Sequence, residues 1–161
     1  MMLAGLLLKK SKLELIIVLT VILVLFSMPI VVLAAVSDLG VIDTHPLYTG
    51  PIDTRDAYAY GNCTYWAALR RIQIGQPIPS TWGNANTWAE RAQLDGYLVD
   101  HIPAMDSIMQ TSAGELGHVA FVESVDTAGN WTISEMNVVG FDQLDTRTLS
   151  AAAAQNFNFI H

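Results

Sequence analysis

The chain contains one cysteine, Cys63, at the point where a helical pattern begins. In an oxidising compartment most cysteines are paired as disulfides, and a single cysteine has no intramolecular partner. A thiol in the first turn of a helix is exposed to the positive end of the helix dipole and to unpaired amide hydrogens, which favour the reactive thiolate. Cys63 is therefore a candidate nucleophile. The alternative is a buried structural cysteine that behaves as a small hydrophobic residue.

A thiol that attacks an acyl carbon needs a base that takes its proton and later returns it to the leaving group. Imidazole can do both near neutral pH. His118 opens a stretch rich in β-forming residues, whereas His45 falls in a linker-like segment and His161 is the last residue of the sequence. His118 is therefore the candidate base, and His101, in a predicted loop, is the alternative.

A β-hairpin is predicted around His118. Residues 118–125 and 131–137 have the composition or the alternation of strands, with turn residues between them. We expect a four-residue loop that leaves Val125 opposite Asn130. The register matters, because a slip of one residue would move every side chain of one strand to the other face.

In this register His118 lies opposite Asn137, and Ala120 lies opposite Glu135. Because side chains alternate along a strand, His118, Glu135 and Asn137 project on the same face, with Glu135 as the diagonal neighbour of the imidazole. A carboxylate or an amide on the far ring nitrogen would fix the tautomer and stabilise the imidazolium. Together with Cys63, these residue types indicate acyl transfer by a cysteine nucleophile.

The elements that would position these residues follow from periodicity and turn chemistry. Two helical patterns come first, and strand patterns follow them. This order predicts an α+β fold with N-terminal helices packed on an antiparallel sheet. The predicted helices are Cys63–Ile74, Asn84–Asp95 and a short one at Ala151–Ala154; the further strands are Ser107–Gln110 and Phe157–Ile160.

Residues 1–36 differ from the rest of the chain. Three lysines, the last of them Lys12, precede an apolar run of 22 residues, Leu15–Val36. About 20 apolar residues suffice to cross a bilayer as a helix, and the lysines predict a cytoplasmic N-terminus. We favour a single-pass membrane anchor; the alternative is a signal peptide, which would release a secreted protein. Residues 37–55 are predicted to be a linker, and 56–161 an exported catalytic domain.

The charge balance excludes some partners. Beyond residue 36 the chain has 5 arginines, no lysine and 14 acidic residues, a net charge of −9. Such a domain repels phosphate backbones, so nucleic-acid binding is not expected. Histidine, cysteine and carboxylate residues do not occur at metal-ligand spacing, and we therefore expect no metal or other cofactor.

Four blocks of sequence occur in order along the chain: Tyr60–Trp66, Trp82–Ala85 with Trp88, Gly117–Val122 and Ile133–Asn137. Together they resemble the CHAP family, the cysteine- and histidine-dependent amidohydrolases and peptidases that act on peptidoglycan. The resemblance implies a papain-like fold. It also implies that Cys63 is the nucleophile, His118 the general base and Glu135 the residue that orients the base, and that Asn137 accompanies this set. By the same resemblance, the backbone amide of Cys63 would help to hold the oxyanion.

Two positions depart from the family pattern. The residue before the nucleophile is commonly glutamine in the family and is Asn62 here. A shorter amide reaches less far, and the loss of one oxyanion donor can reduce a rate by about 10²–10³-fold. The family also often has a glycine shortly after the proline that corresponds to Pro103, where this chain has Ala104–Ser107. That second departure affects a turn rather than the chemistry.

The resemblance implies an exported cysteine hydrolase that cleaves amide bonds of peptidoglycan through a thioester on Cys63. It would act as an N-acetylmuramoyl-L-alanine amidase or as a peptidoglycan endopeptidase. The same residues would serve a transpeptidase that uses an amine acceptor. The alternative from another class is a non-catalytic surface module that binds the wall or a partner in an envelope complex, an interpretation motivated by the acidic surface.

Overall fold

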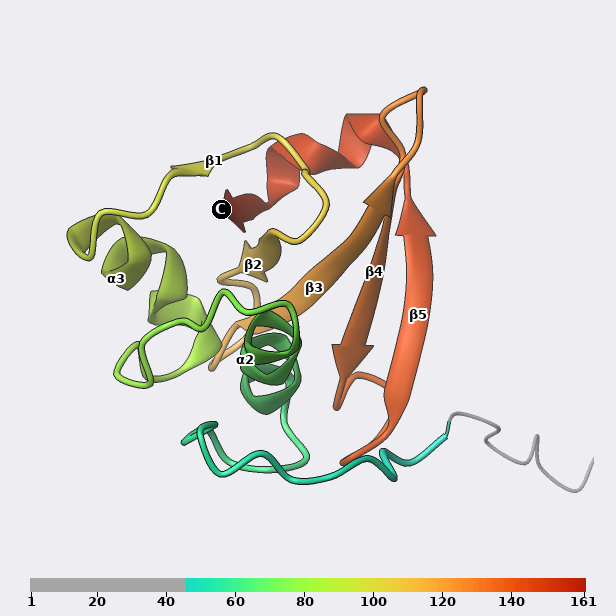
Figure 1. Ribbon diagram of the computed structural model, residues 1–161. Helices are drawn as coiled ribbons and strands as arrows, with labels where there is room; N and C mark the ends of the chain where they lie inside the picture. The colour runs from blue at the N-terminus through green and yellow to red at the C-terminus, as the bar shows by residue number, and fades with distance from the viewer. Residues whose placement is uncertain (1–45) are drawn as a thin grey trace, which may run out of the picture. The chain divides into compact units, whose positions relative to one another are not determined.

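The computed structural model describes residues 46–161 (Figure 1). The predicted membrane anchor or signal peptide, residues 1–36, lies outside the described residues. Within 46–161, no helix combines the length and the apolar character that a membrane span requires.

The described residues form one antiparallel sheet of six strands in the order β1-β6-β2-β3-β4-β5. With helices packed against it, the sheet confirms the predicted α+β class. The structure also contains two strands that we do not expect from the sequence, β1 and β5. The strands are β1 Val99–Asp100, β2 Ile108–Thr111, β3 His118–Val125, β4 Trp131–Met136, β5 Leu144–Leu149 and β6 Asn158–Ile160.

The first helix, α2 Cys63–Gln73, begins at the predicted residue and ends one residue early. The predicted helix over 84–95 is instead a 3₁₀ turn, η1 Ala85–Thr87, followed by α3 Trp88–Leu94. The Thr87 hydroxyl donates to main-chain carbonyls on its N-terminal side, which tightens the backbone into the 3₁₀ turn. A second 3₁₀ helix, η2 Ala151–Asn156, precedes β6.

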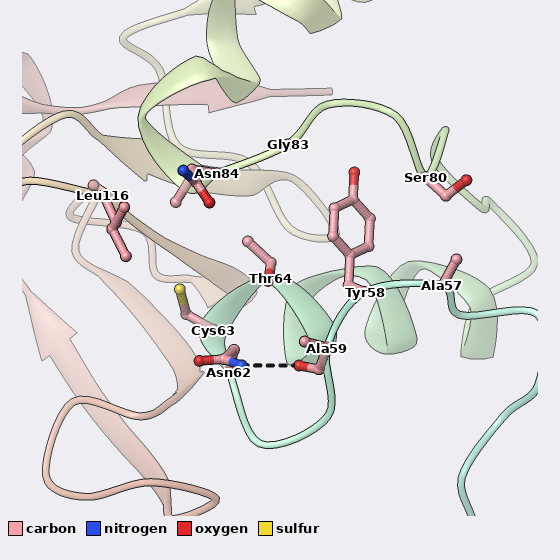
Figure 2. Close-up of a pocket in the computed structure, with 12 residues that line it drawn as sticks. Ala57, Tyr58, Ala59, Asn62, Cys63, Thr64, Ser80, Gly83, Asn84 and Leu116 are labelled. Carbon is pink, nitrogen blue, oxygen red and sulfur yellow. Dashed lines mark hydrogen bonds between the residues drawn. The ribbon is translucent and has the colours of Figure 1, made fainter.

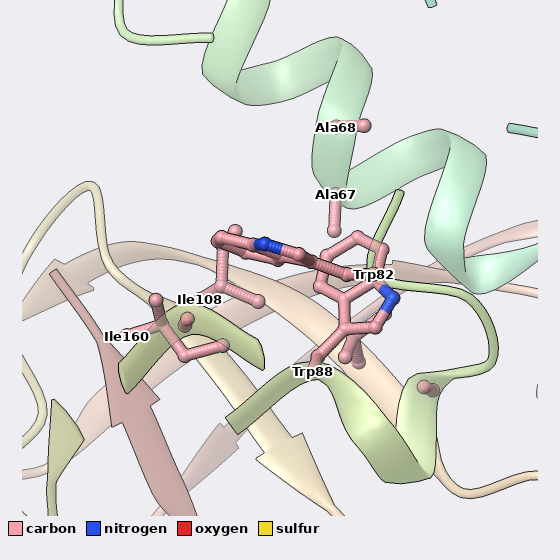
Figure 3. Close-up of a cluster of buried hydrophobic side chains, with 9 residues drawn as sticks. Ala67, Ala68, Trp82, Trp88, Ile108 and Ile160 are labelled. Atoms are coloured by element: carbon pink, nitrogen blue, oxygen red, sulfur yellow. The ribbon is translucent and has the colours of Figure 1, made fainter. Parts of the chain in front are cut away.

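Two tryptophans fill the space between α2, α3 and the sheet (Figure 3). The rings of Trp82 and Trp88 meet edge to face with centroids 5.6 Å apart, and both side chains are buried. Ala67 of α2 contacts this cluster from one side, and Ile108 and Ile160 of the sheet contact it from the other. Aromatic pairs of this geometry contribute beyond their buried area, so the cluster fixes α2 against the sheet.

The opposite face of the sheet has its own core beneath η2. Trp131 of β4 and Phe159 of β6 pack edge to face with centroids 5.0 Å apart, and Ala154 of η2 packs on them. Both faces of the central strands are therefore covered. This explains why Val119 and Ala120, which point to opposite faces, are both fully buried.

The β3–β4 register differs from the prediction at the turn and agrees with it near the site. Val125 pairs with Trp131 rather than with Asn130, so the predicted closure is wrong by one residue. A β-bulge at Glu123 absorbs the difference, and Phe121 pairs with Ser134 as predicted. Without the bulge, the turn register would continue along the hairpin, and Glu135 would point to the face opposite His118.

The segment from Pro46, which we expect to belong to a linker, contacts the domain. Leu47 forms a β-bridge with Gln143, and Leu144 donates its amide to the Pro46 carbonyl at 2.9 Å. The ring of Tyr48 packs edge-on against Trp66 of α2, with centroids 5.5 Å apart. These contacts depend on tertiary structure, and the local sequence carries no sign of them.

Candidate active site

Cys63 is the first residue of α2. Gly61, with φ of 83°, and Asn62, with an extended backbone, bring the chain into the helix. The first helical hydrogen bond runs from the Trp66 amide to the Asn62 carbonyl at 3.1 Å. The amides before Trp66 have no helical acceptor. The half-buried Cys63 side chain is therefore in the turn of α2 that carries unpaired donors.

His118 is the first residue of β3, and the glycine before it determines where it lies. Gly117 has φ of 71°, and a Cβ at this position would lie 2.5 Å from the backbone nitrogen of Asn86. The Asn86 amide donates to the Leu116 carbonyl at 2.8 Å. Only glycine fits between these segments, so the 3₁₀ turn η1, which contains Asn86, holds the start of β3 in place.

The His118 imidazole and the Glu135 carboxylate lie on the same face of the sheet, as the sequence predicts, and contact each other. His118 Nε2 lies 2.7 Å from Glu135 Oε2, and Glu135 is fully buried. Nε2 is engaged by the carboxylate, so Nδ1 is the ring nitrogen left for the Cys63 thiol. The thiol and the imidazole are close enough for each to shift the pKa of the other. The structure thus brings Cys63, His118 and Glu135 together, with the imidazole hydrogen-bonded to the carboxylate.

Arg147 of β5 completes the environment of the carboxylate, and the sequence analysis missed it. Its Nε lies 2.5 Å from Glu135 Oε1, and its Nη2 lies 3.3 Å from Oε2. Burial would raise the pKa of Glu135, but the hydrogen bonds from His118 and Arg147 outweigh burial and lower the pKa. The carboxylate therefore remains charged beside the imidazole. No local pattern marks Arg147, because its strand lies at the edge of the sheet and has exposed central residues.

The thiol and the imidazole shift each other's pKa. Burial raises the pKa of Cys63, but the hydrogen bond and charge of His118, with backbone amides of Val119 and Thr64, bring it below its ordinary value. Burial lowers the pKa of His118, whereas hydrogen bonds to Cys63 and Glu135 raise it to about 9. Both shifts favour the thiolate–imidazolium form over the neutral pair.

Asn137 lies apart from this chain of groups. Its φ is 63°, just beyond the end of β4, and its Nδ2 donates to Asn62 Oδ1 at 3.1 Å. Asn62 Nδ2 in turn donates to the Ala59 carbonyl at 3.1 Å. Asn137 therefore contacts the residue before Cys63, whereas the expected register pairs it with His118.

His101, the alternative base, is engaged elsewhere. Its Nδ1 lies 2.6 Å from the carbonyl oxygen of Phe157, at the start of β6. Within residues 46–161, no three histidine, cysteine or carboxylate side chains are arranged to hold a metal ion. The groups that the structure gathers around Cys63 are the thiol, the imidazole and the carboxylate. Such an arrangement can carry out nucleophilic acyl transfer.

A groove of about 370 Å³ opens beside the sulfur (Figure 2). One wall is formed by the segment 57–59 and the start of α2, including Thr64. The other is formed by Gly83–Ala85 and by Leu116 with Gly117. A substrate bound in this groove would therefore lie against the thiol.

The CHAP domain family matches residues 53–137. This chain belongs to the CHAP family. The match spans Cys63, His118, Glu135 and Asn137.

Two similar proteins of Staphylococcus aureus are among the relatives of this CHAP chain. It is 49% identical over 104 residues to the probable autolysin LDP of Staphylococcus aureus, across 65% of this chain and 37% of that protein. It is 45% identical over 114 residues to the staphylococcal secretory antigen ssaA2 of the same species, across 70% of this chain and 42% of that protein. The chain thus spans less than half the length of the curated relatives it matches.

A solved structure shares the fold. The crystal structure of an N-acetylmuramoyl-L-alanine amidase from Staphylococcus aureus matches this chain with a TM-score of 0.65 and 35% sequence identity. The match covers 74% of this chain and 35% of that one.

Proposed function

We propose that this chain is a cysteine hydrolase that cleaves amide bonds of peptidoglycan. The observation that supports this most directly is the interaction of the Cys63 thiol with His118, whose imidazole is hydrogen-bonded to the buried Glu135. Its family and its similarity to an autolysin and an amidase point to the same substrate. A papain-like arrangement, with the helix of the nucleophile against an antiparallel sheet, agrees with the described elements.

The first half-reaction forms a thioester. The Cys63 thiolate attacks the carbonyl carbon of the scissile amide, and a tetrahedral oxyanion develops beside the backbone amide of Cys63. As the C–N bond breaks, the His118 imidazolium gives its proton to the leaving amine. The now neutral imidazole then takes a proton from water, which attacks the thioester and releases the acid with the thiol regenerated.

Glu135 orients the imidazole and stabilises its charged form, and Arg147 keeps this carboxylate ionised. General acid–base assistance of this kind contributes about 10²–10⁴-fold to a rate. Asn137 acts as a positioning residue, because its bond to Asn62 supports the turn that leads into Cys63. The donor amide of Asn62 is directed at the Ala59 carbonyl, so we assign it no oxyanion role.

The amidase reaction is the first choice for the bond, because the similar solved structure is an N-acetylmuramoyl-L-alanine amidase. Cleavage within or between stem peptides uses the same residues. Peptidoglycan lies outside the cytoplasmic membrane. We therefore propose that residues 1–36 anchor the domain there or act as a secretion signal, and one relative is named a secretory antigen.

The test uses the full-length chain and purified sacculi. We expect the wild type to release soluble fragments. Cys63→Ala should release none while melting nearly as the wild type does, and His118→Ala should release none while remaining folded. His101→Ala is the matched control, since it removes an imidazole away from the site and should retain turnover. Mass spectrometry of the fragments identifies the bond. A non-catalytic wall-binding module would bind sacculi and release nothing, and that outcome would overturn the proposal.

A further inference from the structure

The groove beside Cys63 is uncharged, although the domain around it is acidic. None of its twelve lining residues carries a formal charge apart from the thiolate form of Cys63, and five of them are glycine or alanine. Backbone groups and small side chains thus form much of its walls. Beyond residue 36 the chain carries a net charge of −9.

This contrast discriminates between two kinds of ligand group. A carboxylate that enters the groove loses water and meets no cationic side chain among the lining residues, and the acidic domain repels it. The thiolate–imidazolium pair has no net charge to offset this. A carboxamide of the same size carries no charge and can exchange its bonds to water for bonds to the walls.

Asn84 offers a group that could make those bonds. Its carbonyl accepts from the Thr87 amide at 3.0 Å and from the Thr87 hydroxyl at 2.8 Å, which fixes its backbone. Its side chain is exposed and takes part in no hydrogen bond within residues 46–161. Figure 2 shows the Asn84 amide on the wall that faces Cys63 and Thr64 across the groove. A fixed backbone with a free amide is prepared to bind a ligand.

Asn62, the residue before Cys63, has no free side-chain amide to offer a ligand. Asn62 donates to the Ala59 carbonyl and accepts from Asn137, so both ends of its side chain are engaged. Asn84 is therefore the lining asparagine whose donor and acceptor are both available, and this pair matches a carboxamide.

We infer that the groove binds an uncharged segment of the stem peptide, that Asn84 hydrogen-bonds to a carboxamide there, and that the enzyme selects amidated stems over free-acid stems. This inference rests on the proposed function. In a muramoyl peptide, the carboxyl group closest to the lactyl–alanine bond is the α-carboxyl group of the second stem residue. It is either free or converted to the amide. Asn84 is thus a specificity-determining residue for the substrate.

The test measures binding separately from turnover. Two muramoyl tetrapeptides that differ only in this group, carboxyl in one and carboxamide in the other, are titrated into the full-length Cys63→Ala chain in detergent. We expect at least tenfold tighter binding of the carboxamide peptide. Adding Asn84→Ala should remove most of this preference. Asn156→Ala, the same substitution on η2, is the control and should leave it unchanged.

Equal affinities, tighter binding of the carboxyl peptide, or no binding of either peptide would overturn the inference. A preference that survives Asn84→Ala would overturn the role of Asn84. With active enzyme, we expect Asn84→Ala to raise KM for the carboxamide peptide about tenfold with kcat nearly unchanged, because the contact acts in binding. Sacculus turnover by the wild type tests the proposed function independently, so the two failures are distinguishable.

Discussion

Arg70 of α2 and Glu123 of β3 form an ion pair in which Nη2 lies 2.7 Å from Oε2. Glu123 is the extra residue of the β-bulge, and its other carboxylate oxygen accepts from the Ser134 hydroxyl at 2.6 Å. The pair therefore connects the helix that begins at Cys63 to the irregularity that sets the hairpin register. Because that register brings imidazole and carboxylate to one face, the ion pair couples the positions of all three groups.

Replacing Glu123 by alanine should weaken both the fold and the site. The side chains of Arg70 and Glu123 are 23% and 31% exposed, so we expect a loss of about 1–2 kcal/mol in the free energy of unfolding. We also expect kcat to fall about tenfold under conditions where the variant is folded, since small displacements of reacting groups slow a reaction. Urea denaturation and initial rates on sacculi measure the two effects.

The control is Arg55→Ala, which breaks an exposed ion pair with Asp53 that links no two elements. It should change neither the unfolding curve nor kcat. If Glu123→Ala loses stability but retains the kcat of the wild type, the bulge contributes to the fold alone.

The pH dependence should separate thiolate formation from turnover. The thiolate forms as pH rises through the lowered pKa of Cys63, and the imidazolium is lost as pH rises through the pKa of His118, about 9. Iodoacetamide alkylation requires the thiolate alone, so it should persist below the ordinary thiol pKa of about 8.5. Hydrolysis requires both groups and should fall on either side of this window, with apparent pKa values that belong to the pair.

His118→Ala should move the alkylation profile of Cys63 toward that of an ordinary thiol. An alkylation rate that follows a pKa of about 8.5 already in the wild type would contradict the ion pair and favour a non-catalytic domain.

Arg147→Met removes one of the two groups that keep Glu135 ionised. The lowered pKa of Glu135 contributes stability above its unfolded pKa, and this contribution is lost as pH falls through the folded value. On acidification, the variant should therefore begin to lose stability at a higher pH than the wild type. At neutral pH we expect a loss of about 1 kcal/mol in the free energy of unfolding, a small value because the Arg147 side chain is 45% exposed. We expect kcat to fall about tenfold, far less than the roughly 10⁴-fold seen when an orienting carboxylate is neutralised.

The measurement is thermal unfolding between pH 3 and pH 8 together with initial rates. Arg91→Met, the same change on an exposed arginine of α3, serves as the control and should shift neither quantity. If Arg147→Met is as stable in acid as the wild type, His118 alone keeps the Glu135 carboxylate charged.

The sequence predicts the helix of Cys63 and the strands of His118 and Glu135 because each has a clear period and a glycine or turn boundary. The bulge at Glu123 leaves no such trace, since an alternating pattern does not reveal which residue leaves the ladder. The predicted turn is wrong by one residue, and the prediction also omits the one-residue bulge, so the two errors compensate each other beyond Glu123. The predicted face of Glu135 is therefore right, although the turn is wrong.

Arg147 was beyond the reach of pattern analysis for a different reason. Its strand, Leu144–Leu149, lies at the edge of the sheet, and its central residues are exposed, so no alternation of apolar residues marks it. Asn137 left the expected face because its positive φ ends β4 there. Both residues depend on how the β4–β5 connection folds, which tertiary contacts decide.

Alanine substitutions at Gly117 and Gly114 can be compared to measure the steric requirement for glycine directly before His118. Both glycines have positive φ, 71° and 80°, but only at Gly117 would a Cβ meet other atoms, 2.5 Å from Asn86 N and 2.7 Å from the Thr111 carbonyl oxygen. Gly114→Ala should therefore cost about 1–2 kcal/mol from the left-handed backbone alone. Gly117→Ala should cost about 1–3 kcal/mol more from overpacking.

The difference between the two alanine variants in urea denaturation isolates the clash. Because His118 follows Gly117 directly, Gly117→Ala should also shift the iodoacetamide profile of Cys63 toward higher pH, whereas Gly114→Ala should leave the profile unchanged. Equal losses of stability in both variants, with unchanged profiles, would mean that the 3₁₀ turn η1 yields. In that case the contact with Asn86 would not be what fixes the imidazole beside the sulfur.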